Sequence, residues 1–287
     1  MNKPWLKQYP AGVPAEIDMQ RFASLVDMLS DSCKRFAHLP AYRSMGVAMS
    51  FRELDEASHA FAAWLQGPAG LQRGDRVALM MPNLLQYPVA LFGILRAGMV
   101  VVNVNPLYTP RELKHQLRDA DVRAIVVLEN FAHTLQEVIG NTQVRTVVTT
   151  EVGDLLPPLK RLLTNAVVKH AKKMVPAWRL PESVGWRNAL AAGRAQQLDA
   201  VPLGHDDLAF LQYTGGTTGV AKGAQLSHGN MVANVLQVGA WMSPNLQEGQ
   251  ETLILPLPMY HVFALTGALS FFSQGAQAVL ILSLIHI

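Results

Sequence analysis

Hydrophobic positions in this chain alternate between short continuous runs and longer stretches with helical spacing. Short runs that are mostly apolar or β-branched occupy residues 75–81, 99–104, 124–128 and 146–150, and stretches with a helical pattern occupy 84–97, 109–120 and 131–139. A strand that is buried on both faces is continuously apolar, and a strand–helix–strand unit pairs its strands in parallel. The pattern therefore predicts an α/β fold of mainly parallel sheets with helices on both faces.

Two of the predicted helices have clear start signals. Ser50 and Glu53 have the spacing of a capping box, and Thr109 is followed by a proline and by Glu112 at the third helical position. The first helix should end before Gly67 and the second at about residue 120. Residues 25–36 also have helical spacing, whereas the prolines in the first twenty residues predict an irregular arm.

The chain divides into three parts. A first α/β run covers about 20–150, a variable basic segment with several prolines covers 151–206, and a second α/β run covers 207–287. The basic segment contains one helical stretch. In the second run the pattern predicts strands at 208–213, 223–226, 252–257 and 277–281, and helices at 228–238 and 262–272.

Composition narrows the possible partners. The chain has 287 residues, of which 50% are hydrophobic, and a net charge of +3 that is too small and too dispersed to predict a nucleic-acid partner. The apolar stretch after Val262 is interrupted by polar residues 273–277, which argues against a transmembrane span. The N-terminus lacks the apolar core of a signal peptide and Cys33 is the only cysteine, so a cytoplasmic location is expected.

A glycine- and threonine-rich loop follows the predicted strand at 208–213. Residues 214–219 read Thr-Gly-Gly-Thr-Thr-Gly, and Lys222 follows three residues later. Such a loop can turn its N–H groups inward around an anion, and the lysine adds a mobile positive charge. It is not a Walker A loop, because Val220 and Ala221 separate the last glycine from the lysine. The pattern favours a phosphate site, and the alternative is a plain turn with a solvated lysine.

Residues 213–224, YTGGTTGVAKGA, resemble the signature loop of the adenylate-forming, or AMP-binding, superfamily. Residues 81–117 and 255–265 are similar to bacterial long-chain fatty acid CoA ligases within it. The resemblance implies the incomplete N-terminal large domain of an adenylate-forming enzyme, with the small C-terminal domain absent. It also implies an ATP-dependent enzyme that converts a fatty acid to an acyl adenylate and then to acyl-CoA, with ATP, Mg²⁺ and coenzyme A. The alternatives are a ligase for an aryl or amino acid, and a non-catalytic nucleotide-binding fragment.

The resemblance also assigns roles to individual residues. Thr217 would be the hydroxyl ligand of Mg²⁺, Lys222 would neutralise charge on the leaving pyrophosphate, and His261 would position the carboxylate and the adenylate. From spacing alone, a hydrogen-bonded structural histidine is the favoured explanation of His261, and only the resemblance reverses this. The residues expected to bind the nucleotide are Tyr213, Thr214, Gly215, Gly216, Thr217, Thr218, Gly219, Lys222 and Gly223.

Several parts of the family's machinery do not occur in this sequence. They are the glutamate of the Tyr-Gly-x-Thr-Glu motif, the aspartate that holds the ribose, the basic hinge and the catalytic lysine of the small domain. Residues 283–287 are apolar and resemble nothing in the family. Residues 1–287 alone are therefore expected to be inactive.

Residues 157–178 have an amphipathic and basic pattern. Apolar residues from Leu159 to Met174 follow one helical face, and five Lys and Arg residues lie largely off it. This pattern is typical of a helix at a membrane surface, and it predicts peripheral contact with the inner face of the cell membrane, from which a fatty acid substrate could be drawn. The alternative is a helix packed on its own domain with solvated lysines.

Overall fold

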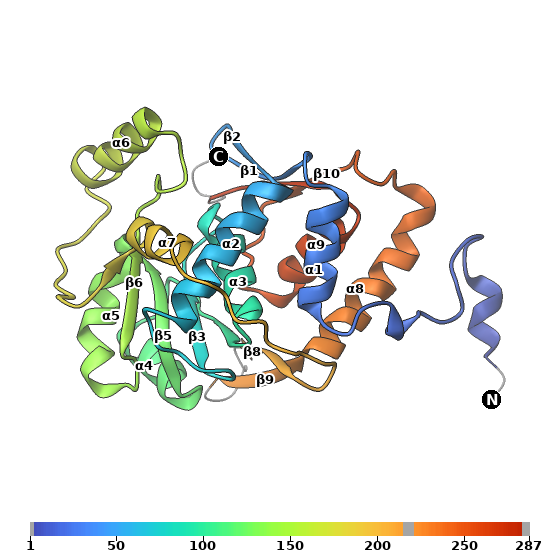
Figure 1. The fold of residues 1–287 in the computed structure, drawn as a ribbon, viewed down its shortest axis with the longest axis horizontal. Helices are drawn as coiled ribbons and strands as arrows, with labels where there is room; N and C mark the ends of the chain where they lie inside the picture. Colours follow the sequence, from blue (N-terminus) through green and yellow to red (C-terminus); the bar gives the residue numbers. More distant parts are fainter. Residues whose placement is uncertain (1–2, 215–220, 283–287) are drawn as a thin grey trace.

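The computed structural model describes residues 3–214 and 221–282 of the chain (Figure 1). Its strands are β1 (Pro40–Ser44), β2 (Val47–Ser50), β3 (Arg76–Met80), β4 (Val100–Asn103), β5 (Val122–Leu128), β6 (Thr146–Thr150), β7 (Val184–Gly185), β8 (Leu208–Thr214), β9 (Lys222–Ser227), β10 (Thr252–Leu255) and β11 (Gln277–Leu280). Its α-helices are α1 (Leu25–Arg35), α2 (Phe51–Gln66), α3 (Gln86–Arg96), α4 (Pro110–Asp119), α5 (Ala132–Val138), α6 (Pro158–Ala166), α7 (Trp186–Arg194), α8 (His228–Met242) and α9 (Val262–Ser273). A π-helical turn, η5 (Val167–Ala171), follows α6, and short 3-10 helices are η1 (Pro4–Gln8), η2 (Met19–Arg21), η3 (Glu129–Phe131), η4 (Ile139–Asn141) and η6 (Ser243–Asn245).

Within residues 3–214 and 221–282 the strands form two sheets. The larger sheet has seven strands in the order β7-β6-β5-β3-β4-β8-β9, and every neighbouring pair is parallel except β8 and β9. The smaller sheet has the order β10-β11-β1-β2, in which only β1 and β2 pair antiparallel. The prediction of mainly parallel sheets is confirmed.

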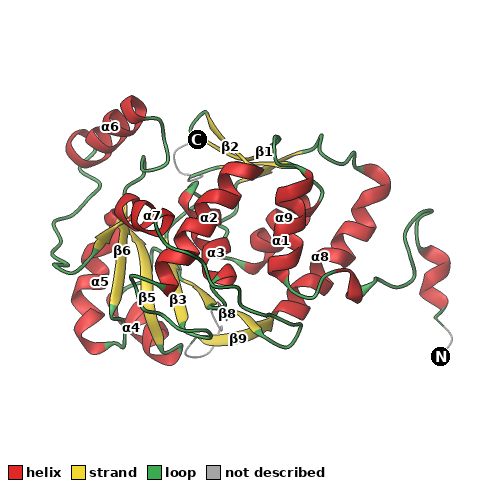
Figure 2. Cartoon of the chain, viewed as in Figure 1, coloured by secondary structure: helices red, strands yellow, loops and turns green. Residues whose placement is uncertain are grey.

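Helices cover both faces of the larger sheet (Figure 2). On one face, α4 and α5 pack Leu113 and Leu135 against Ile125 of β5. On the other face, α2, α3 and α7 contribute to a larger core that also contains Tyr42 of β1 and Phe272 of α9. This second core therefore joins the two sheets. The covered faces explain why β3, β4 and β5 read as continuous apolar runs.

The predicted helix starts are confirmed at the level of side chains. Ser50 and Glu53 form a reciprocal capping box at α2, Thr109 and Glu112 form one at α4, and Ser227 caps α8. The hydrogen bonds from Thr109 lower the pKa of the Glu112 carboxyl. Each cap satisfies main-chain N–H groups that have no partner within the helix, and it stabilises the fold by about 1 kcal/mol.

The main differences from the sequence prediction concern β1, β2, β7, α7 and α8. The β1–β2 hairpin was missed because its turn uses Met45 and Gly46, both with positive φ, and not the Asn-Gly pair that usually marks such turns. Strand β7 and helix α7 were missed because β7 has only two residues and α7 starts without a side-chain cap or an acidic first turn. Helix α8 continues four residues beyond the predicted end, to Met242.

The buried imidazole of His228 makes the stability of this fold depend on pH. Its Nδ1 accepts a hydrogen bond from the Leu25 N–H at 3.2 Å, so a proton on that nitrogen would face another donor. Burial lowers the pKa of His228 from 6.5 to about 4, against the smaller opposing effects of Asp207 and Asp27. The contribution of His228 to the stability of the fold is fully present above pH 6.5, where its imidazole is neutral in the unfolded chain as well. This contribution is lost as the pH falls toward 4.

We therefore expect the free energy of unfolding to fall by about 2 kcal/mol between pH 7 and pH 5 through this residue. His228→Asn, whose amide oxygen can accept the same bond without titrating, should lose most of this dependence. Urea unfolding of both proteins across this pH range measures the difference. Parallel pH profiles for the two proteins would contradict the assignment.

Candidate functional site: the β8–β9 turn and the His261 segment

Strands β8 and β9 fix both ends of the predicted phosphate loop. They pair antiparallel, with Thr214 directly opposite Lys222, and both of these residues are exposed. The loop therefore leaves the sheet at the carboxyl end of β8, which is where open parallel sheets bind ligands. The predicted site residues Gly215, Gly216, Thr217, Thr218 and Gly219 lie outside the described residues, so their roles stay predictions.

The side chain of Tyr213 lies on the α4 side of the sheet. Its hydroxyl donates to the Asp119 carboxylate at 2.5 Å, and burial, followed by the contact with Asp119, raises the pKa of the phenol well above its usual value. Gly223 lies directly opposite, where an added Cβ would be 2.9 Å from the Tyr213 ring. Gly223 thus makes room for a ring that fixes β8 to α4. A nucleotide contact from Tyr213 would come from its main chain.

A buried amide pair connects β8 to the segment that carries His261. Asn103 of β4 donates to Gln212 Oε1 at 3.0 Å, and Gln212 Nε2 donates to the main-chain oxygen of Tyr260 at 2.8 Å. The Tyr87 hydroxyl lies 2.6 Å from Asn103 Oδ1 and 3.0 Å from the Met259 oxygen. Buried and satisfied polar groups of this kind specify one arrangement of the chain. The loop base and residues 259–261 are thereby held next to each other.

Asn83 holds the same segment from the other side. Its Nδ2 donates to the main-chain oxygens of Leu255 at 3.1 Å and Leu257 at 2.9 Å, and its Oδ1 accepts from Met259 N–H at 2.8 Å. Asn83, Asn103 and Gln212 were not predicted as positioning residues. Their signal in the sequence is a polar residue in or directly after an otherwise apolar run.

His261 is the N-cap residue of α9, and its ring is exposed. The ring lies beside the ring of Tyr260, with centroids 4.6 Å apart, and makes no hydrogen bond within the described part of the chain. The main chain of His261 is fixed by its N–H, which donates to the Pro258 oxygen at 3.0 Å. The imidazole is thus available to a ligand, and its role beside the carboxylate stays a prediction.

The apolar residues after His261 separate into two groups. Phe263 is 78% exposed, whereas Ala264 and Leu265 are buried in the core. Of these three residues, only Phe263 is therefore accessible to a ligand.

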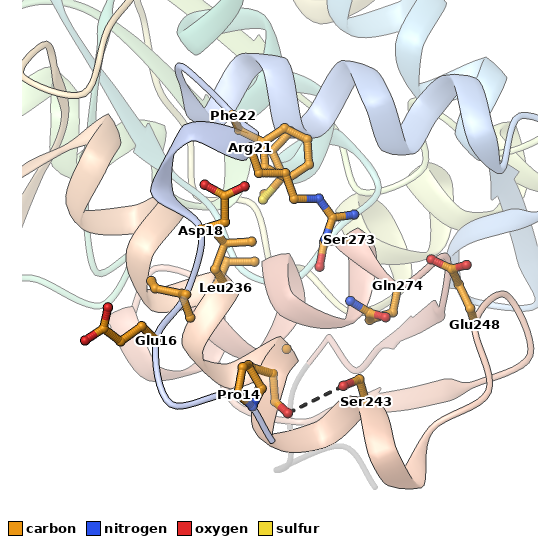
Figure 3. Close-up of a pocket in the computed structure, with 15 residues that line it drawn as sticks. Pro14, Glu16, Asp18, Arg21, Phe22, Leu236, Ser243, Glu248, Ser273 and Gln274 are labelled. Carbon is orange, nitrogen blue, oxygen red and sulfur yellow. Dashed lines mark hydrogen bonds between the residues drawn. The ribbon is translucent and has the colours of Figure 1, made fainter. Parts of the chain in front are cut away.

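Two cavities are found in the described residues, and neither contains a predicted site residue. One of about 400 Å³ lies between the N-terminal arm and α8, where Arg21 and Phe22 face Leu236 (Figure 3). The other, of about 380 Å³, includes Glu129 and Asp154, whose carboxyl pKa values are raised by burial. Across residues 3–214 and 221–282 no cluster of three His, Cys, Asp or Glu residues could hold a metal ion.

This arrangement of two sheets and a loop at the end of β8 is the fold of adenylate-forming ligases. The anthranilate CoA ligase AuaEII in complex with anthranoyl-AMP superposes with a TM-score of 0.75 at 21% identity, over 93% of this chain and 47% of that one. A long-chain-fatty-acid-CoA ligase from Archaeoglobus fulgidus gives a TM-score of 0.74 at 22% identity, over 96% and 50% of the two chains. The AMP-binding enzyme family model matches residues 29–284, so the chain belongs to this family.

Curated relatives with high identity are named long-chain-fatty-acid–CoA ligase. The protein from Escherichia coli O157:H7 is 57% identical over 98% of this chain, and that from Haemophilus influenzae is 52% identical over the same share. A 4-coumarate-CoA ligase 2 from Narcissus pseudonarcissus is 28% identical over 84% of this chain and 39% of its own length. This chain spans about half the length of the fatty acid ligases that it matches.

Proposed function

We propose that a protein of the relatives' full length, with this chain as its N-terminal half, is an ATP-dependent long-chain fatty acid CoA ligase. The observation that carries the proposal is the 57% identity to a ligase of that name, against 28% to a coumarate ligase. The protein would join a fatty acid to AMP and then transfer the acyl group to coenzyme A.

The first step requires groups that stabilise negative charge on the leaving pyrophosphate. A carboxylate oxygen of the fatty acid attacks the α-phosphorus of ATP, and the bond from that phosphorus to the pyrophosphate oxygen breaks. Negative charge collects on the leaving group, where an ammonium group and oriented N–H donors stabilise it. Lys222, exposed at the start of β9, would supply the ammonium group. The N–H groups of residues 214–219 would supply the donors, and His261 would hold the carboxylate.

Magnesium is the metal that we propose for this site. Its proposed ligand in this chain is the hydroxyl of Thr217, since a hydroxyl oxygen suits a hard cation. Among the described residues no group of three His, Cys, Asp or Glu side chains could hold a metal ion, and Thr217 lies outside them. When bound, Mg²⁺ would neutralise phosphate charge.

Exchange of labelled pyrophosphate into ATP tests the proposal on the complete protein. We expect exchange that depends on long-chain fatty acids and is weak with coumarate, anthranilate or amino acids. Exchange with aryl or amino acids alone would reject the fatty acid substrate, and nucleotide binding without any exchange would support a non-catalytic module. Residues 1–287 alone should form no acyl-CoA, because they lack the glutamate, aspartate and lysine motifs named above.

We also propose that the protein acts in the cytoplasm and contacts the inner face of the cell membrane peripherally, through residues 157–178. In the part of the chain that the structure describes, no helix has the length and apolar character to cross a bilayer. The support for surface contact is the run of Lys and Arg residues beside exposed leucines in this segment.

A further inference from the structure

Helix α6 presents its apolar face outward. Leu159, Leu162 and Leu163 are 81%, 68% and 63% exposed, and their spacing places them on one side of the helix. No residue of α6 is buried, and Figure 1 shows the helix at the edge of the molecule. Its Lys160 Nζ donates to the Met45 main-chain oxygen in the β1–β2 turn. Large leucines in this number on one exposed face usually mark a contact with another apolar surface.

The polar face of α6 is the one that touches the protein. Asn165 Oδ1 accepts from the Gly153 N–H at 2.8 Å, and Asn165 Nδ2 donates to the Glu151 carboxylate at 2.8 Å. An added Cβ at Gly153 would lie 2.6 Å from Asn165 Oδ1 and 3.1 Å from Arg161 Cα, so the contact is tight. A helix packed on its own domain would bury its apolar stripe instead. Among the described residues nothing covers the apolar stripe of α6.

The segment around α6 is uniformly positive. Residues 155–181 contain no Asp or Glu, and their Lys and Arg residues are Lys160, Arg161, Lys169, Lys172, Lys173 and Arg179. Lys169 is paired with the buried Glu129 at 3.5 Å. Lys172 and Lys173 are exposed and form no ion pair within the described residues. The charge of the segment complements an anionic surface.

Lys172 and Lys173 lie in the turn after η5 and not on a continued α-helix. The predicted face that runs to Met174 is wrong beyond α6, because the α-helix ends at Ala166, η5 follows, and Lys173 has a φ of +50°. Asn130 Nδ2 donates to the Met174 main-chain oxygen at 2.9 Å and holds the end of this turn on the protein. The leucines thus lie on α6, and the two lysines lie directly after η5 in the same segment.

We propose that Leu159, Leu162, Leu163, Lys172 and Lys173, the α6 docking face, bind an anionic lipid bilayer. The leucines enter the boundary between headgroups and acyl chains, and the lysines lie among the lipid phosphates. This inference rests on the proposed function, because it specifies which surface would bring the ligase to its fatty acid. It commits to a bilayer as the occupant because the face combines an apolar centre with unpaired positive charge.

Co-sedimentation of the complete protein with vesicles tests the α6 docking face. The vesicles contain phosphatidylcholine, with or without phosphatidylglycerol. The triple variant L159Q/L162Q/L163Q should bind at least about tenfold more weakly than the unaltered protein. Lys172→Gln and Lys173→Gln should each weaken binding about fivefold, only on vesicles with phosphatidylglycerol and less at high salt. Leu107→Gln is the matched control, since Leu107 is 76% exposed elsewhere, and should bind unchanged.

A probe on α6 separates a bilayer from other occupants. Leu162→Cys, in a complete protein from which any cysteines outside residues 1–287 have been removed, provides an accessible thiol for an environment-sensitive dye. Cys33, the only cysteine of residues 1–287, is buried with its pKa raised to about 12. A blue shift that requires phosphatidylglycerol vesicles supports the proposal. A blue shift that grows with protein concentration indicates that a second copy of the protein binds the α6 docking face. A dye that is already blue-shifted before vesicles are added indicates that the rest of the protein covers this face. Either result, or unchanged sedimentation of the leucine variant, overturns the proposal.

Pyrophosphate exchange with detergent-dispersed fatty acid needs no bilayer. It therefore reports failure of the proposed function separately from failure of the α6 docking face.

Discussion

Lys222→Ala is expected to lower the rate of fatty-acid-dependent pyrophosphate exchange by the complete protein about a hundredfold or more. Removing a group that stabilises charge only in the transition state has an effect of this size. Lys222 is the first residue of β9, and its partner in the sheet is Thr214, at the other end of the loop. Its position at the loop base is therefore fixed by the sheet. The loss should appear mainly in kcat and not in the KM for the fatty acid.

The matched control for this variant is Lys34→Ala. Lys34 is exposed on α1, and its side chain makes no ion pair within the described residues. Thr217→Ala, at the proposed magnesium ligand, should also slow exchange and should raise the Mg²⁺ concentration needed. If Lys222→Ala exchanges pyrophosphate at the rate of Lys34→Ala, the loop has no role in adenylation.

Gly193→Ala is expected to lower the free energy of unfolding by more than about 3 kcal/mol. An added Cβ at Gly193 would lie 1.9 Å from the Ala60 main-chain oxygen and 2.8 Å from the Ala60 carbonyl carbon. The clash is between the backbones of α7 and α2, so no change of rotamer relieves it. Helix α2 has little room to move, because on its other side Gly93 of α3 packs against the Phe61 ring, 2.8 Å from an added Cβ.

Urea unfolding of Gly193→Ala beside Gly140→Ala measures this effect. Gly140 has no atom within 4 Å of an added Cβ and its φ is not positive, so alanine there should leave stability unchanged or slightly raised. Equal stability of the two variants would show that α2 and α7 separate at little cost. The comparison isolates helix packing from the general effect of replacing glycine.

The sequence predicted the strands and helices that are specified by nearby residues, such as an apolar run or a helix cap. Strands β3, β4 and β5 were predicted because both of their faces are covered, and α2 and α4 because their caps lie within four residues of sequence. The ends of the phosphate loop were also predicted, since the apolar run of β8 stops where the glycines begin. The family itself follows from the residues of this loop and its flanks, and the match over 29–284 confirms it.

The orientation of side chains at the site was decided by the tertiary structure. Tyr213 points toward Asp119 because its neighbour Gln212 takes the other face of β8, where Asn103 is its partner. Leu265 is buried in the core while Phe263, two residues earlier, is exposed. The sequence pattern does not show which face of β8 the side chains of Gln212 and Tyr213 take, or which of Phe263 and Leu265 is buried. Only the contacts with neighbouring helices and strands decide this.

Taken by itself, the sequence determined most of the strands and helices, the capped helix starts and the place of the loop, because each depends on residues near one another in the chain. Only the tertiary structure joined β1 to β11 across more than two hundred residues, brought Asn83 to Met259 and turned the leucines of α6 away from the protein. The physical reason is that hydrophobic periodicity reports that a face is apolar but not what covers it. For α6 the pattern predicted an apolar face, and the packing of Gly153 against Asn165 decided that this face meets the surroundings.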